Sequence, residues 1–317
     1  MLDFGIEIGQ FEIMNKLDSA ERARILHLLC EGSSIRAITR LTGASKITVS
    51  KLLCDAGKAC AAYHDEHVRN LKSKRIQLDE IWAFIYAKQK NVADAKAAPD
   101  GAGDVWTWTA IDADTKLIAS YFVGGRDGEC AMWFVDDLRS RLANRVQITS
   151  DGHKAYLEAV EGAFGGDVDY AQLIKIYGAS SDSAKGRYSP ADCTGIKKER
   201  IEGKPDMAHV STSYVERSNL TMRMHMRRFT RLTNGFSKKV ENHAYAVALH
   251  MMYYNFVRVH QKLRMSPAMA AGVSKRLWEV ADIVALVEVE EAKSVPTKRG
   301  QYKKRDAAYR QIIPGGL

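Results

Sequence analysis

Paired cysteines, prolines and long apolar runs are scarce in this 317-residue chain. No run approaches the roughly 20 apolar residues that a membrane-spanning helix needs, so we expect no membrane partner. Five cysteines are an odd number and none forms a C-x-x-C pair, which argues against a disulfide framework and a zinc knuckle. The first residues carry acids and no basic stretch, unlike a secretory signal. These absences predict a cytoplasmic protein.

Positive charge is what the chain has in excess. It carries 47 basic and 38 acidic residues, for a net charge of +9. The segment from residue 216 to 264 contains ten lysines and arginines but only two acids, Glu216 and Glu241. Nearly the whole excess of positive charge therefore lies in this segment. Charge concentrated in this way indicates a polyanionic partner more strongly than the total does.

The first 65 residues have the pattern of an arm followed by an all-α domain. Residues 1–14 show no regular period. Capping residues at Asp18, Ser33 or Ser34, and Ser45 predict three helix starts, and glycines end the first two helices. Two short helices joined through a glycine turn are typical of a helix-turn-helix, so we expect a DNA-binding domain over 15–65 and a polar linker over 66–75.

The third of these helices is the candidate recognition helix. Its spacing turns Val49, Leu52 and Leu53 inward and leaves a polar set facing outward near its start. Such residue types contact phosphates and base edges. A plain three-helix bundle with a solvated face is the competing interpretation. The candidate DNA contacts are Lys46, Thr48, Ser50 and Lys51.

From residue 76 the period changes to that of strands. Three strands, a helix, a strand, a helix and a further strand predict a mixed α/β sheet flanked by helices, in the order of the ribonuclease-H-like architecture. We expect the domain that contains this sheet over 76–272, with a polar loop or insertion at 178–208 and long helices over 211–232 and 237–260. A basic tail is expected over 273–317. The strands are expected near 76–82, 105–111, 116–123, 146–150 and 170–176.

Three carboxylates lie at positions where they could be catalytic or bind a metal. Asp79 interrupts an apolar strand, which costs free energy unless the charge is paired or holds a metal. Asp151 ends a strand, where open sheets place their sites, although Asp-Gly is also a common turn. Glu216 shares a helix face with Asn219, Arg223 and Arg227, which suits a metal beside a phosphate backbone. The alternative, purely structural interpretation of Glu216 is that it forms a capping box with Ser213 or belongs to a solvated charged face.

These residues also carry a resemblance. The segments L-D-E-I-W, T-S-D-G-H-K-A-Y, Y-V-E-R-S-N-L-T-M-R, G-F-S-K-K-V-E-N-H and Y-N-F-V-R-V-H-Q-K-L-R-M-S-P-A-M-A-A resemble bacterial insertion-sequence transposases of the insertion-sequence-one type. The resemblance covers about residues 76–272. Many relatives carry a cysteine-rich zinc finger before the helix-turn-helix, and this chain has no such cysteines.

The resemblance implies an Asp–Asp–Glu triad of Asp79, Asp151 and Glu216 on a ribonuclease-H-like domain. It implies two Mg²⁺ or Mn²⁺ ions, recognition of the inverted ends of a mobile element, a homo-oligomer on DNA, and a bacterial cytoplasm with association to the nucleoid. The expected activity is DNA strand cleavage followed by strand transfer. The basic segment supplies further candidate DNA contacts at Arg217, Asn219, Arg223, Arg227, Arg231, Lys238 and Lys239.

Two other functions fit the same residues. A nuclease on the same fold would share the carboxylates but release cut DNA without joining it. A non-enzymatic regulator, including a domesticated transposase, would work through the helix-turn-helix alone. A strand-transfer assay distinguishes a transposase from such a nuclease. Substitution of the carboxylates distinguishes a transposase from such a regulator.

Overall fold

Side-chain caps start the three N-terminal helices of the computed structural model, which describes residues 17–178, 193–230 and 234–293. Asp18 accepts a hydrogen bond from the Glu21 amide at 2.7 Å, and Ser34 and Ser45 cap the next two helices in the same way. Gly43 ends the second helix at φ 76°, a conformation that favours glycine. The helices are α1 (Ser19–Cys30), α2 (Ile35–Thr42) and α3 (Lys46–His67).

Six strands form one mixed sheet in the order β3-β2-β1-β4-β5-β6. The first three pair as an antiparallel meander, β4 and β5 run parallel to β1, and β6 is antiparallel to β5. The α/β sheet predicted from the sequence is thereby confirmed. The strands are β1 (Arg75–Ile85), β2 (Gly103–Asp112), β3 (Ile118–Gly124), β4 (Val146–Ser150), β5 (Val168–Tyr177) and β6 (Cys193–Glu202).

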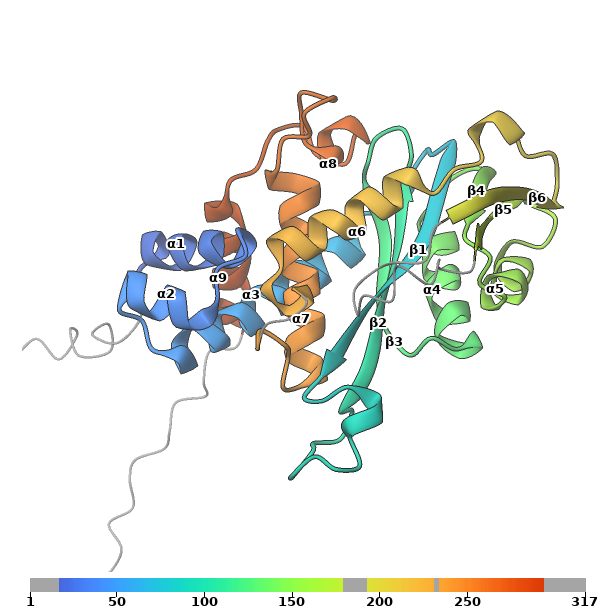
Figure 1. Cartoon of the computed structure of the whole chain (residues 1–317). Helices are drawn as coiled ribbons and strands as arrows, with labels where there is room; N and C mark the ends of the chain where they lie inside the picture. The colour runs from blue at the N-terminus through green and yellow to red at the C-terminus, as the bar shows by residue number, and fades with distance from the viewer. Residues whose placement is uncertain (1–16, 179–192, 231–233, 294–317) are drawn as a thin grey trace, which may run out of the picture.

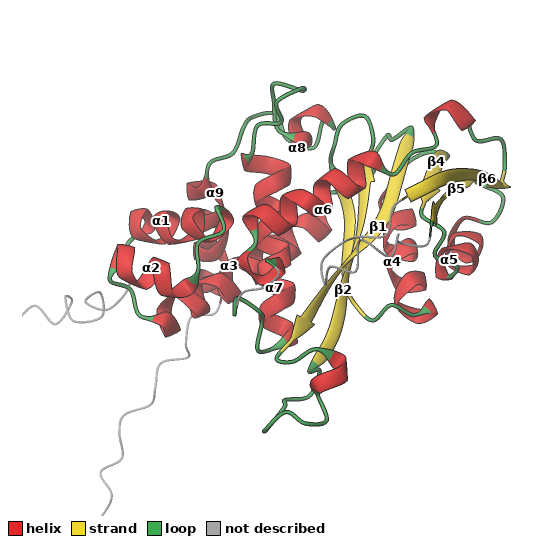
Figure 2. Cartoon of the chain, viewed as in Figure 1, coloured by secondary structure: helices red, strands yellow, loops and turns green. Residues whose placement is uncertain are grey.

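Helices cover both faces of this sheet. Helices α4 (Gly128–Arg141) and α5 (Ala155–Phe164) lie on one face, and α6 (Ser213–His225) crosses the other face against β1 and β2. Figure 1 shows α1, α2, α3 and α7 (Val240–Met252) gathered beyond α6, and Figure 2 shows the sheet between the two helical layers. Helix α6 therefore lies between the sheet and the helical part of the molecule.

Helices α3 and α7 cross at close range because Gly57 has no side chain. A Cβ atom at this position would lie 2.3 Å from the backbone oxygen of Tyr245 and 2.6 Å from its Cα. Buried residues of α1 to α3, the sheet, α7 and α9 (Val280–Lys293) belong to one hydrophobic cluster. The helical part and the sheet thus share a continuous core.

Several elements differ from the sequence-based prediction. Strand β6 lies inside the segment 178–208, which was expected to be a loop, because it pairs with β5 despite its polar sequence. Residues 179–192 of that segment lie outside the description. The helix expected over 211–232 ends at His225 and gives way to a 3₁₀ turn, η4 (Arg227–Phe229).

The C-terminal region contains more structure than a tail. Helix α7 continues into a π-helical turn, η5 (Tyr253–Val257), and a short α8 (Pro267–Ala270) follows. Within 273–317, α9 packs against α1 and α3 through Ile283, Val284 and Val287, and residues 294–317 lie outside the described chain. Two more 3₁₀ turns are η1 (Gln89–Asn91) and η3 (Met207–His209). Within the described ranges, every helix is too short or too polar to cross a bilayer.

Candidate metal centre and nucleic-acid interface

Two adjacent parallel strands bring the predicted aspartates together. Asp79 lies within β1, and Asp151 directly follows β4, which pairs with β1 in parallel through Gln77 and Thr149. Carboxylate oxygens of Asp79, Glu80 and Asp151 lie within 4.8 Å of one another. The cluster therefore joins residues more than 70 positions apart in the sequence.

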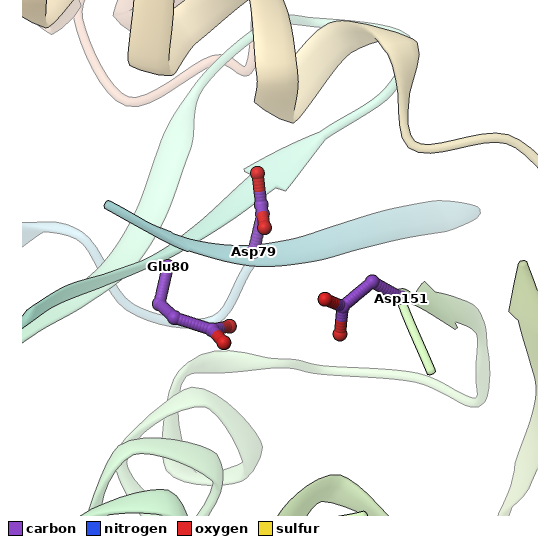
Figure 3. A group of neighbouring side chains, drawn as sticks. All are labelled: Asp79, Glu80 and Asp151. Atoms are coloured by element: carbon purple, nitrogen blue, oxygen red, sulfur yellow. The ribbon is translucent and has the colours of Figure 1, made fainter. Parts of the chain in front are cut away.

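Glu80 is the member that the sequence analysis missed. Asp79 and Glu80 leave opposite faces of β1, and the Asp151 carboxylate points toward Glu80 (Figure 3). Alternation along a strand turns neighbouring side chains to opposite faces of the sheet. The two carboxylates nevertheless lie close together beside Asp151, and the available signal was only that a second acid follows Asp79 directly.

Both oxygens of Glu80 already have partners. Its Oε1 accepts a hydrogen bond from Arg126 Nε at 2.7 Å, and its Oε2 accepts one from the Tyr156 hydroxyl at 3.0 Å. The Glu80 side chain is only 2% exposed. Burial and the charge of Asp151 raise the pKa of Glu80, whereas the hydrogen bond from Arg126 opposes that rise. Glu80 is therefore a buried carboxylate held in place from α5 and from the loop after β3.

Asp79 carries the strongest electrostatic signature of the cluster. Burial, together with the negative charges of Glu80 and Asp151, raises its pKa to about 7. Glu216 contributes in the same direction. Mutual repulsion of this kind favours binding of a cation, which stabilises all the charged forms at once.

Glu216 lies on α6, beside the aspartate cluster and outside it. Its Oε1 forms an ion pair with Lys175 Nζ at 2.7 Å and accepts a hydrogen bond from the Thr212 hydroxyl. Burial disfavours the charge of Lys175, but the bond to Glu216 and the charge of Asp79 contribute to a net rise in its pKa. Lys175 thus interacts electrostatically with both Glu216 and Asp79.

A glutamine from β1 fixes the start of the helix that carries Glu216. Gln77 Oε1 accepts hydrogen bonds from the backbone amides of Tyr214 at 2.8 Å and Val215 at 3.2 Å. Helix α6 begins at Ser213 without a cap from its own side chains. The alternative that Ser213 and Glu216 form a capping box is therefore wrong, since Ser213 is already the first helical residue.

Asn219 joins α6 to the cluster directly. Its Nδ2 donates a hydrogen bond to Asp79 Oδ2 at 2.8 Å. The residue is 7% exposed, so its amide faces the aspartate instead of the surface where a DNA contact was predicted. One turn of helix separates it from Glu216, and both side chains lie on the part of α6 that faces β1 and β5.

A basic groove brings residues of α3 and of the basic segment side by side. The cavity has a volume of about 660 Å³ and lies between the starts of α2 and α3, the end of α6 and the start of α7. Of the predicted DNA contacts, Lys46 and Ser50 line it from α3, and Arg227 and Lys238 line it from the other side. We call this cavity the basic groove.

The other predicted DNA contacts are dispersed. Lys51 forms an ion pair with Asp55 at 2.6 Å, and the Thr48 hydroxyl bonds to Ser45. Arg217 lines a separate pocket beside α6, and Arg223 is half-buried on α6. Lys239 immediately precedes α7, and Arg231 lies outside the described residues.

No protein-family model and no curated protein sequence matches the chain. Two solved structures resemble it distantly. A cryo-EM structure of the piggyBac transposase synaptic complex with hairpin DNA has 9% identity and a TM-score of 0.39, over 88% of this chain and 73% of that one. The crystal structure of the Mos1 strand transfer complex has 12% identity and a TM-score of 0.20, over 75% and 76% of the two chains. Likenesses of this size carry no argument about function.

The chemistry available at this site follows from its oxygen donors. Carboxylates are the ligands that Mg²⁺ and Mn²⁺ prefer, and few protein ligands suffice because such ions keep several waters. Of the three clustered carboxylates, Asp79 is the one that contacts α6, through Asn219, and Glu216 lies on the same helix. Its arrangement suits a divalent cation held next to an anionic substrate.

Proposed function

We propose that this protein is a DNA transposase that cuts DNA and joins the new end to a second DNA site. Asp79, Asp151 and Glu216 are the proposed catalytic residues. The observation that carries the proposal is the meeting of Asp79 and Asp151 at one point, with the Glu216 helix tied to Asp79 through Asn219. The strand order, which is that of the ribonuclease-H-like architecture, supports the same conclusion.

The donor set fits divalent cations. Asp79 and Asp151 offer oxygens that approach within 4.8 Å, and burial together with neighbouring negative charge raises the pKa of Asp79. Asp79, Asp151 and Glu216 would hold two Mg²⁺ or Mn²⁺ ions, with Glu216 exchanging Lys175 for a metal. Such ions supply activation of the attacking oxygen and stabilisation of the leaving oxygen at a phosphodiester.

The surrounding residues position this set. The Asn219 amide orients the Asp79 carboxylate, and Gln77 anchors the first turn of α6 to β1. Lys175 neutralises Glu216 and lies where it can contact a phosphate. Arg126 and Tyr156 hold Glu80 through both its oxygens, so we assign Glu80 a positioning role.

We assign DNA binding to the basic groove and to the start of α3, which lines it. Helices α2 and α3 form the proposed helix-turn-helix, whose Lys46 and Ser50 share the basic groove with Arg227 and Lys238. Phosphate contacts from such a groove fix the DNA, and residues at the start of α3 read the element ends. The remaining proposed contacts are Thr48, Lys51, Arg217, Arg223, Arg231 and Lys239. A homo-oligomer in the bacterial cytoplasm would hold two such ends together.

Substitution of the carboxylates tests the triad. We expect Asp79→Asn, Asp151→Asn and Glu216→Gln each to reduce strand cleavage and strand transfer by at least about 100-fold, because each removes a charged metal ligand. The measurement is a gel assay with labelled element-end DNA, a target plasmid and Mg²⁺. Retained DNA binding by gel shift shows that each variant still folds.

Glu80→Gln is the matched control. It keeps the shape of the side chain and one hydrogen-bond acceptor, so it should retain more activity than Glu216→Gln. If Glu80→Gln were inactive and Glu216→Gln active, the third ligand would be Glu80 and the proposed triad would be wrong.

The products separate the alternatives. A nuclease without joining activity gives cleaved ends and no joined product. A regulator predicts full activity in cells for Asp79→Asn and Glu216→Gln alike. The transposase proposal requires a joined product that disappears with each triad variant.

A further inference from the structure

A second cavity lies on the side of α6 that faces away from the aspartate cluster. It has a volume of about 690 Å³, within the range of small-molecule pockets. Tyr214, Arg217, Ser218 and Thr221 line it from α6, where the spacing i, i+3, i+4, i+7 places them on one helix face. We call it the α6 pocket. Glu216 lies on the same helix, between Tyr214 and Arg217 of this wall.

Positive charge concentrates in this pocket. Lys116 from the turn after β2, Arg258 and Lys262 from the segment after η5, and Arg217 all line it, and its described lining includes no carboxylate. Arg217, Arg258 and Lys262 form no ion pair with any residue in the described ranges. These cations are therefore available to an anionic ligand.

Unsatisfied polar atoms accompany the charges. Ser218 is 2% exposed, and its hydroxyl has no hydrogen-bond partner in the described part of the chain. The same holds for the buried Nδ1 atom of His260, which also lines the pocket. Buried polar groups usually have partners, so these two atoms indicate a ligand that offers hydrogen-bonding groups.

An aromatic ring completes the lining. The Tyr214 side chain is exposed in the pocket, and the Lys116 ammonium lies 3.1 Å from the centroid of its ring. A ring presented beside cations is the combination by which proteins hold unpaired nucleotides, with the base on the ring and the phosphate on the cations.

On this basis we propose that the α6 pocket holds one unpaired nucleotide of the bound DNA strand, with its phosphate on Arg217, Arg258 and Lys262 and its base on Tyr214. The inference rests on the proposed function, and it adds that one nucleotide of the bound DNA strand is unpaired. Extruding a paired base from its stack costs free energy for unpairing, whereas an unpaired base avoids that cost and enters a recessed cavity more readily. Phosphate alone would use the cations but leave Tyr214, Ser218 and His260 without a role.

The test compares two DNA probes in EDTA, so that no cleavage is needed. One is a blunt duplex and the other carries a short single-stranded overhang. Wild-type protein should prefer the overhang, and Tyr214→Ala should lower its affinity for that probe by roughly 5- to 150-fold, the value of stacking one base. Tyr214→Phe keeps the ring and should keep the preference.

Further variants exclude a general effect. Ser218→Ala removes no internal hydrogen bond, so thermal stability should hold while overhang affinity falls. Lys238→Ala, in the basic groove, should weaken both probes without changing their ratio. An unchanged ratio in Tyr214→Ala and Arg258→Gln would overturn the proposal, as would an acidic peptide that competes as well as the overhang. An absence of strand transfer would count against the proposed function, but the comparison of the two probes would still test the α6 pocket, because it measures binding without cleavage.

Discussion

At the scale of single residues, the site depends on side chains whose roles only the structure reveals. Gln77 lies on β1, two residues from Asp79, and the sequence offers no reason to separate it from other strand residues. In the structure its carbonyl satisfies two amides of α6 that have no partner within the helix. Asn219 and Glu216 are held in position as a result.

Replacing Gln77 tests this anchoring. We expect Gln77→Leu to destabilise the protein by about 1–3 kcal/mol, because two helix amides lose a buried acceptor. It should also lower strand-transfer activity, since α6 carries Glu216. Urea unfolding and the gel assay measure the two effects. Ser213→Ala is the control, because among the described residues the Ser213 hydroxyl has a hydrogen bond with Ser211 alone. Equal losses in both variants would contradict the assignment.

At the scale of elements, local patterns predicted the starts of helices better than their ends. Caps at Asp18, Ser34 and Ser45 are local contacts, and the sequence identified them. Strand β6 was missed because its sequence is polar and its stability comes from pairing with β5. Helix α9 was missed because its apolar face matters only once α1 and α3 cover it.

The crossing of α3 and α7 gives a test at this scale. Gly57→Ala places a Cβ atom against the backbone of Tyr245, so the helices must separate, at a cost of about 1–3 kcal/mol. Gly162→Ala is the control, because a Cβ there meets nothing within 4 Å. Alanine also favours a helix over glycine by roughly 0.5–1 kcal/mol. Thermal unfolding should therefore show opposite shifts, and similar shifts would refute the close crossing.

At the scale of the whole molecule, one core joins the helical part to the sheet, and buried histidines lie at several points around it. His64 bonds to the backbone of β3, whereas His243 and His250 lie on α7. Burial lowers the pKa of His64 to about 4 and of His243 and His250 to about 3, with nearby cations adding to the effect.

These histidines predict acid sensitivity. In the unfolded chain they titrate near pH 6.5, and in the folded chain they stay neutral until pH 4 or below. The contribution of these histidines to stability is therefore full above about pH 6.5, and it falls by roughly 1.4 kcal/mol per histidine for each unit that the pH drops below that value. Urea unfolding between pH 7 and pH 5 measures the slope. His250→Gln should make it shallower, and a flat profile would contradict the neutral buried state.

The candidate site shows the same division between local and distant information. Asp79, Asp151 and Glu216 could be selected from strand position, turn position and helix face. Glu80 and Lys175 could not, because their proximity depends on the pairing of β1 with β4 and on the packing of α6 beside β5. The proposed DNA surface was predictable as charge, but the grouping of Lys46 with Arg227 in the basic groove was not.

A crystal structure with bound Mn²⁺, located by its anomalous scattering, tests the central claim most directly. The account predicts manganese between Asp79 and Asp151, with the Glu216 carboxylate released from Lys175 and bound to the metal. Manganese ligated by Glu80 in place of Glu216, or no manganese at these carboxylates, would contradict it.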